Sequence, residues 1–279
     1  QDSRDALPAQ AWHELRGIAE GAGISLEAAL LLNLWEPPSD AAAASESLAF
    51  AFAEHPSGRA ALGVRGQTLC SDPLVFKAVS TAEGGSYGLL GRPGDLGGWI
   101  GLNKAGVALA SLPAASADQR LGGLPSTTLL GLALQASTTA EGAARWLAQA
   151  RRSGGGGALL VEGSSGQAAL LEWTAHRHTL HSASGSVWSW SGTLQDPWLR
   201  ELGGNAPPSG AAGSWLQANA GWLSREKALA WLAEEAREDG CPAALLLPDA
   251  AQWWFSCPGC GDAAALVHLN LDEVLSRGR

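Results

Sequence analysis

Residues 41–52, with the sequence AAAASESLAFAF, mark the point at which the chain changes character. Pro37, Pro38 and the alanine run before Ser45 are typical of a loop, because the residue before a proline avoids the helical region of backbone space. From residue 47 the sequence becomes a short apolar run that is typical of a β-strand. A small hydroxyl residue, Ser45, therefore stands where a linker gives way to a strand.

Two short helices are predicted before this junction, within residues 9–35. Trp12, Leu15 and Ile18 recur at helical spacing in the first, and Leu26 and Leu30 belong to an apolar face in the second. Glycines at 21 and 23 separate the two, and the proline pair ends the second.

After the junction the pattern changes to short strands separated by turn residues. Gly-rich segments between the first strands predict hairpins, Gly154 to Gly157 predict a flexible turn, and residues 203–213 predict a loop. The capping-box spacing of Thr138 and Glu141 marks the start of a helix, and Ser224 is suited to cap another. The strands are predicted at 47–54, 59–64, 74–79, 87–90, 99–102, 107–112, 158–162, 168–174, 179–182, 187–191, 243–247, 252–256 and 265–269, and the helices at 127–136, 138–151 and 224–239.

Alternating blocks of strands and helices favour the α+β class, with helices layered on mostly antiparallel sheets. The 279 residues suffice for one large domain with a substantial core, and we expect a single domain over 1–279.

Charge and hydropathy exclude several classes of partner. The formal net charge is −9 and the 18 Lys and Arg residues are scattered, which argues against a nucleic-acid or anionic-membrane surface. No apolar run approaches the ~18 residues needed to span a bilayer. The segment around Gly101 lacks the second half of a Gly-rich phosphate fingerprint, and we expect no cofactor.

The four cysteines are too few and too unevenly spaced for a disulfide framework. Cys241, Cys257, Cys260 and His268 have a spacing that zinc could use, and Cys257 with Cys260 has the spacing of a redox pair. Unligated or disulfide-paired cysteines in the last strands are the favoured interpretation. Cys70, two residues before an aspartate, is likewise interpreted as a small buried residue rather than a nucleophile.

We interpret two further clusters of charged or titratable residues as structural. His176, His178 and His181 lie close together in sequence without an acidic cluster beside them, so we interpret them as part of a solvated strand face. Arg151 and Arg152 end a predicted helix, where cations complement the helix dipole.

Several short motifs follow one another in a fixed order: ELRGIAEGAG at 14–23, GLNKAGV at 101–107, GLP at 123–125 and LLEW at 170–173. With the serine junction, this set resembles the acyl-coenzyme A:6-aminopenicillanic acid acyltransferase-like family of N-terminal-nucleophile hydrolases and acyltransferases. The resemblance covers nearly the whole chain and implies a four-layer αββα sandwich. It also implies a precursor that cleaves itself, with 1–44 as a propeptide or α-subunit-like helical segment and 45–279 as a β-subunit-like segment.

The family usually cleaves before the Cys of a Cys-Thr-Ser-Phe-Ala motif, and this chain has SESLA at 45–49. Ser45 then falls on the nucleophile and Ser47 on the hydroxyl two residues later. Attack of the Ser45 hydroxyl on the preceding carbonyl would give an ester that water opens, and the freed α-amine, with a pKa near ~8, would be the base. Asn103 or backbone amides would stabilise the oxyanion, although Asn103 also fits a turn role. The implied substrate is a small acyl-amide.

Besides the serine at 45 in place of a cysteine, two further positions depart from the family pattern. Gln67 stands where the family carries an Asp that orients the site, and Trp190 or a neighbour stands where it carries an oxyanion Asn. Loss of one oxyanion donor typically costs about 10²–10³ in rate. Two hypotheses follow: an amide hydrolase or acyltransferase that uses Ser45, and an inactive homologue that keeps the fold and uses its cleft for binding.

Overall fold

A computed structural model describes residues 6–34, 48–65, 74–80, 85–182, 187–190, 210–239, 242–256 and 266–277. Within these residues the strands form two sheets in which every pairing is antiparallel. Sheet A has the order β10 (Val187–Trp190), β1 (Leu48–Ala53), β2 (Ala60–Arg65), β11 (Ala243–Leu247), β12 (Gln252–Ser256) and β13 (Leu266–Asn270). Sheet B has the order β3 (Val75–Ser80), β4 (Ser86–Gly91), β5 (Ile100–Asn103), β6 (Val107–Ala114), β7 (Gly155–Glu162), β8 (Ala168–Trp173) and β9 (His178–Ser182).

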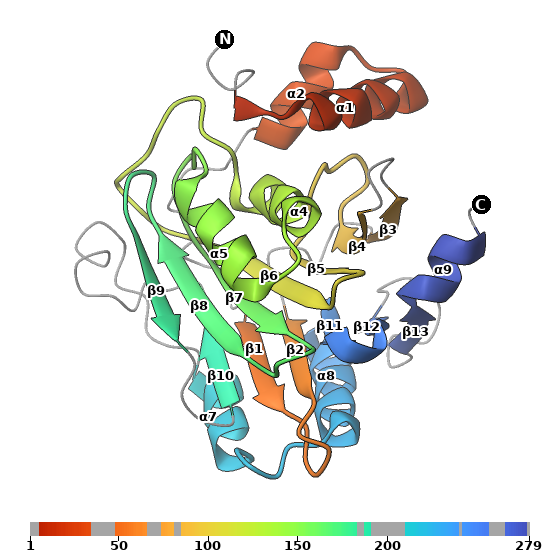
Figure 1. Ribbon diagram of the computed structural model, residues 1–279, viewed down its shortest axis with the longest axis vertical. Coiled ribbons are helices and arrows are strands. Elements are labelled where there is room, and N and C mark those ends of the chain that lie inside the picture. The colour runs from red at the N-terminus through yellow and green to blue at the C-terminus, as the bar shows by residue number, and fades with distance from the viewer. Residues whose placement is uncertain are drawn as a thin grey trace.

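Helices cover the outer face of each sheet (Figure 1). On sheet B lie α1 (Ala9–Ala22), α2 (Leu26–Leu34), α4 (Ser126–Ala136) and α5 (Ala140–Gln149). On sheet A lie α7 (Gly210–Ala218) and α8 (Arg225–Asp239), while α9 (Leu271–Arg277) follows β13. The three interfaces of this stack coincide with three clusters of buried apolar side chains. The α+β class and the four-layer αββα arrangement are therefore confirmed.

The sequence of β1 explains how its layer forms. Alternate residues of a strand point to opposite faces of a sheet. Ala49 and Ala51 accordingly face sheet B, whereas Leu48, Phe50 and Phe52 face α8. All five are buried. Small residues toward the second sheet and large ones toward the helices make β1 apolar on both faces.

The glycine run at 154–157 corrects a prediction, because Gly155 to Gly157 belong to β7 and are not a flexible turn. A Cβ at Gly156 would lie 2.9 Å from the Trp173 ring on one face, and a Cβ at Gly157 would lie 2.5 Å from the Trp190 ring on the other. Glycine is required here because two indoles pack directly on the strand backbone. Composition alone suggests a turn, since glycine is also the commonest turn residue.

The helix starts are partly as predicted. Ser224 caps α8, with its Oγ accepting from the Lys227 amide at 3.3 Å. Thr139, and not Thr138, caps α5, since its side chain accepts from the Gly142 amide at 3.0 Å. The predicted loop at 203–213 is too long, because α7 already begins at residue 210.

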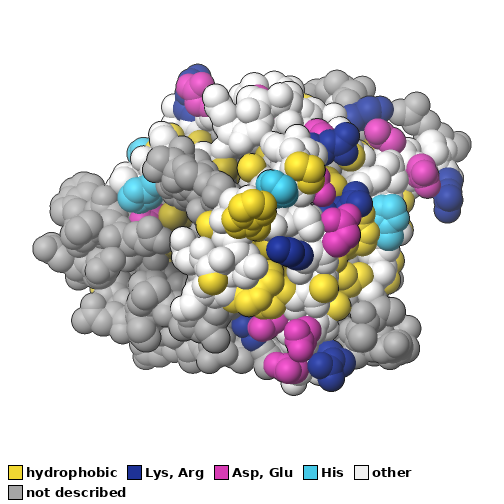
Figure 2. Space-filling model, turned by 90° about the horizontal axis from the view of Figure 1, so that it is seen from below, with side chains coloured by type: hydrophobic (Ala, Val, Ile, Leu, Met, Phe, Trp, Pro, Cys, Tyr) yellow, Lys and Arg dark blue, Asp and Glu magenta, His cyan; other side chains and the backbone are white. Residues whose placement is uncertain are grey.

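Among the described residues no single helix is long and apolar enough to cross a bilayer; α1 and α2 pass only as a pair, which is bent by 116°. On the face shown in Figure 2, cationic and anionic side chains lie beside one another with apolar groups between them.

The chain's one tyrosine, Tyr87 on β4, is buried beneath α1 and α4. Burial, reinforced by the nearby Glu14 carboxylate, raises the pKa of Tyr87 far above its ordinary value of 10.0. The unfolded chain therefore loses this proton at a lower pH than the native protein. The stabilisation is fully present below pH 10.0 and is lost as the pH rises above it.

We therefore expect the free energy of unfolding to fall by about 1.4 kcal/mol per pH unit above the ordinary tyrosine pKa. Ultraviolet difference absorbance of tyrosinate follows the group directly, since tryptophans do not titrate. In denaturant the same tyrosine should ionise at its ordinary pKa. Ionisation at that same pKa in the native protein would contradict the burial described here.

Candidate active site

The end of sheet A at which β1 begins is the candidate active site. Leu48 pairs with Arg65 at the end of β2, Ala49 pairs with Trp190 at the end of β10, and Arg65 pairs with Ala243 at the start of β11. The chain segments before β1, after β2, after β10 and before β11 all join the described residues at this edge. The topology thus brings strand ends that are far apart in sequence next to the start of β1.

The predicted catalytic serines and several other residues fall in those segments. Ser45, Ser47 and Gln67 lie outside the described residues, as do all four cysteines. Ser45 precedes Leu48 by three residues and Gln67 follows Arg65 by two. Their assigned roles therefore stay predictions. In the part of the chain that is described, no three His, Cys, Asp or Glu residues are grouped so that they could hold a metal ion.

A buried carboxylate, Glu172 on β8, lies close to this edge, and sequence reasoning did not single it out. Its side chain is 0% exposed. Oε1 accepts a hydrogen bond from the Trp190 indole nitrogen at 2.9 Å, and Oε2 lies 2.8 Å from His181 Nε2. Glu172 therefore ties the end of β10 in sheet A to β9 at the edge of sheet B. A lone acid inside the apolar LLEW strand was the signal that could have found it, because buried charges require partners.

Trp190 fills the space between the sheets next to the start of β1. Its ring is 1% exposed and packs on the bare backbone of Gly157. That Trp190 or a neighbour replaces the asparagine of the family pattern stays a prediction. The residue is part of the inter-sheet core.

Arg65 carries the opposite charge at the same edge. Its side chain points toward the outer helix layer, where Nη1 lies 2.9 Å from Glu235 Oε2 of α8. The ion pair is only partly exposed on both sides. It fixes the end of β2 to α8 on the face of sheet A away from Trp190.

Asn103, the third predicted catalytic residue, is 5% exposed at the end of β5. Its Nδ2 donates to the carbonyl oxygens of Leu134 at 2.9 Å and Ser137 at 2.6 Å, and its Oδ1 accepts from the Val107 amide at 3.0 Å. Asn103 therefore closes the β5–β6 turn and caps the C-terminal end of α4. This geometry supports the turn role, because both amide hydrogens are already donated.

We expect Asn103→Ala to lower the free energy of unfolding by about 2–3 kcal/mol, because it leaves buried backbone groups without partners. Thermal or denaturant unfolding measures this loss. If Asn103 has only this structural role, the Asn103→Ala variant keeps an unchanged kcat per folded molecule. A fall in kcat with unaltered stability would instead assign Asn103 to the oxyanion.

The prediction of a solvated strand face holds for part of the histidine cluster, because His176 and His178 are exposed whereas His181 is half-buried. His181 contacts Glu172, and His176 lies in the turn before β9 with Nδ1 2.6 Å from Asp118 Oδ1. Arg120 donates to His176 Nε2 at 3.2 Å, so the ring proton on Nδ1 faces Asp118. Burial opposes the charge of Asp118, but hydrogen bonds from Thr174 and His176 outweigh it and lower the Asp118 pKa. The sequence did not show this because Asp118 is 58 residues away.

The helix-end interpretation of Arg152 is confirmed. Its side chain is buried, and its Nη1 donates to the carbonyl oxygens of Leu147 at 2.9 Å and Ala148 at 2.6 Å, at the end of α5. Nε also donates to the Thr174 carbonyl oxygen at 3.0 Å. Burial, together with the neighbouring Arg120, lowers the Arg152 pKa to about 10. The residue joins α5 to the turn that carries His176.

A cavity of about 510 Å³ lies away from the candidate site. It is lined by the far end of β1, Ala51 to Ala53, and by Glu141, Leu180 and Ser182. Leu48, at the other end of the strand, does not line it. We therefore do not assign it to the chemistry expected at Ser45.

Two antiparallel sheets with helices on both outer faces make up an αββα sandwich. No protein-family model and no curated protein matches the sequence. Among solved structures, the N-acylethanolamine-hydrolyzing acid amidase ortholog of Caenorhabditis elegans is similar, with a TM-score of 0.51 and 9% identity over 72% of this chain and 93% of that one. At this identity the similarity shows the shared fold alone.

Two variants of the conjugated bile acid hydrolase from Clostridium perfringens are also similar in structure. Their TM-scores are 0.48 and 0.47, at 9% and 10% identity. Each match covers 81% of this chain and 93% of the hydrolase chain.

Proposed function

We propose that the protein hydrolyses or transfers the acyl group of a small acyl-amide, with Ser45 as an N-terminal nucleophile exposed by self-cleavage. The observation that carries the proposal is the position of Ser45, three residues before β1, an interior strand of sheet A in this αββα sandwich. The order of sequence motifs, which resembles the penicillin acyltransferase-like family, supports the same assignment. The names of the similar solved structures, an amidase and a bile acid hydrolase, fit this class of chemistry.

The proposed reaction has two stages. In the first, the Ser45 hydroxyl attacks the carbonyl carbon of residue 44 and the C–N bond breaks, which frees the Ser45 amine and leaves the acyl group as an ester on Oγ. Water then cleaves that ester and releases the Ser45 hydroxyl and the carboxylate of residue 44. In each turnover the amine takes the hydroxyl proton, Oγ attacks the substrate carbonyl, and the leaving amine receives the proton. Water or a second amine then takes the acyl group from Oγ.

The described residues suggest how the oxyanion would be held. Because Asn103 donates both amide hydrogens elsewhere, backbone amides at the start of β1 are the better donors in this proposal. Ser47 would orient the nucleophile. Residues 1–44 would remain as an α-subunit-like segment, since α1 and α2 pack on sheet B.

A non-catalytic binding protein is the second candidate, and Trp190 favours it. The indole occupies inter-sheet space beside β1, where the family pattern implies an oxyanion donor. In this case the cleft binds a ligand without turning it over.

Denaturing mass spectrometry of the purified chain tests the first candidate. We expect two fragments, corresponding to residues 1–44 and 45–279, and release of amine from small acyl-amides. A single uncleaved chain after long incubation, with no acyl release, would favour the binding protein. A matched sample purified in denaturant reports whether any cleavage depends on folding.

A further inference from the structure

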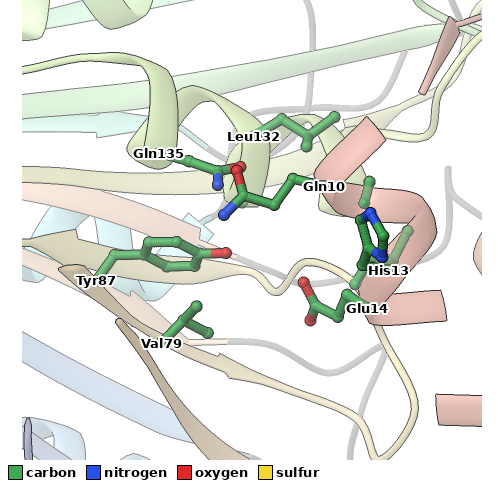
Figure 3. Close-up of a pocket in the computed structure, with 10 residues that line it drawn as sticks. Gln10, His13, Glu14, Val79, Tyr87, Leu132 and Gln135 are labelled. Carbon is green, nitrogen blue, oxygen red and sulfur yellow. The ribbon is translucent and has the colours of Figure 1, made fainter. Parts of the chain in front are cut away.

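A second pocket lies between α1 and sheet B, with a volume of about 270 Å³ (Figure 3). Polar side chains from three parts of the chain surround it: Gln10, His13 and Glu14 from α1, Tyr87 from β4 and Gln135 from α4. Figure 3 shows the Tyr87 hydroxyl, the Gln10 amide and the Glu14 carboxylate directed toward the same space.

This pocket is separate from the candidate active site. Tyr87, Leu96 and Leu132 belong to the cluster between sheet B and its helices. Ala49 and Ala51 of β1 belong to the cluster between the two sheets. Sheet B therefore stands between the pocket and the start of β1.

The Tyr87 hydroxyl reaches the pocket without a partner. Tyr87 is only 4% exposed, and among the described residues its hydroxyl makes no hydrogen bond. The side-chain amides of Gln10 and Gln135 likewise make none within the described part of the chain. The hydroxyl opens to the pocket, so a ligand seated there can hydrogen-bond to it without first breaking a bond within the described protein.

The charges around the pocket are balanced. Lys77 Nζ lies 2.5 Å from Glu14 Oε1 and also donates to the carbonyl oxygens of Asp95 at 3.1 Å and Leu96 at 2.6 Å. Glu14 Oε2 remains available as an acceptor, and His13 is the other titratable group of the lining. A charged ligand would lose its hydration here without a matching opposite charge, so an uncharged one is favoured.

We propose that this pocket binds a small uncharged molecule with a carboxamide head on an apolar body. The head group would exchange hydrogen bonds with Tyr87, Gln10 and Gln135, each of which can donate and accept. The body would lie against the apolar part of the lining, which includes Val79 and Leu132. The volume is that of about nine water molecules, which suits a ligand of about ten non-hydrogen atoms.

Benzamide is a probe of this size, and the chain's one tyrosine is a built-in reporter. In full-length protein with isotope-labelled tyrosine rings, we expect benzamide to shift the Tyr87 resonances in a saturable manner. Benzoate has the same planar shape and benzylamine a similar size, but both carry a charge and should bind at least about tenfold more weakly. Absence of any shift at millimolar benzamide, or equal binding of a charged analogue, would overturn the proposal.

Two substitutions locate the site. Tyr87→Phe removes only the hydroxyl, and Gln135→Ala removes one amide; each should weaken benzamide binding by about two- to tenfold in ligand-observed titrations. Gln217→Ala on α7 is the matched control and should bind as the unaltered protein does. Unchanged affinity in both pocket variants would place the binding elsewhere and refute the assignment. The result is independent of the proposed chemistry at Ser45, because each titration can be repeated in a Ser45→Ala background.

Discussion

Ser45→Ala is expected to abolish self-cleavage and to reduce acyl-amide turnover by at least about a thousandfold. Alanine has no oxygen to attack either the preceding carbonyl or the substrate, and the reaction divides into two easier steps only through that attack. Intact mass and release of the amine product measure the two losses separately. Removal of the nucleophile alone costs a hydrolase most of its catalytic advantage, and residual activity then comes from binding and oxyanion stabilisation.

Two companion variants make this result specific. Ser45→Cys should still cleave and turn over, because a thiol is a stronger nucleophile at neutral pH than a hydroxyl. Ser276→Ala on α9 removes an exposed hydroxyl far along the chain and should leave both activities intact. Full cleavage and turnover in Ser45→Ala would show that the nucleophile is another residue.

Glu172→Ala is expected to lower the free energy of unfolding by about 3 kcal/mol. It removes a fully buried carboxylate and leaves the Trp190 indole nitrogen and His181 without this acceptor. Each buried donor that loses its partner costs about 1–3 kcal/mol, and the vacated volume adds to the loss. Denaturant unfolding gives the free energy, and tryptophan fluorescence reports on the surroundings of the indoles.

The amide isostere separates shape from charge at this position. Glu172→Gln keeps an oxygen for the Trp190 indole and places an amide group against the His181 ring, so it should cost only about 1 kcal/mol. Glu141→Gln, at a largely exposed site on α5, should change stability by less than about 0.5 kcal/mol. If Glu172→Ala costs no more than that control, the buried contacts do not stabilise the fold as argued.

The layer architecture was predictable because its causes are local. The two-residue alternation of β1 and the Ser224 cap of α8 each depend on neighbours in the sequence. Blocks of such elements restrict the packing to a few layered arrangements. The fold class therefore followed from patterns that a single sequence displays.

The partners of the buried polar groups were not predictable in the same way. Glu172 accepts a hydrogen bond from Trp190 only because β8 of one sheet faces β10 of the other. Tyr87 lines a pocket with residues of α1 only because that helix packs on sheet B. The glycines of β7 were assigned to a turn because their role is to admit rings from distant segments. Such contacts depend on how the layers are superposed, which no local pattern specifies.

The contact between Gly157 and Trp190 links the two positions in evolution. Any side chain at 157 would meet the indole, and any small residue at 190 would leave a void against bare backbone. A smaller residue at 190 therefore calls for added volume on β7, and a larger residue at 157 calls for a smaller one at 190. We expect the two positions to change together, which restricts how the inter-sheet space beside β1 can be repacked.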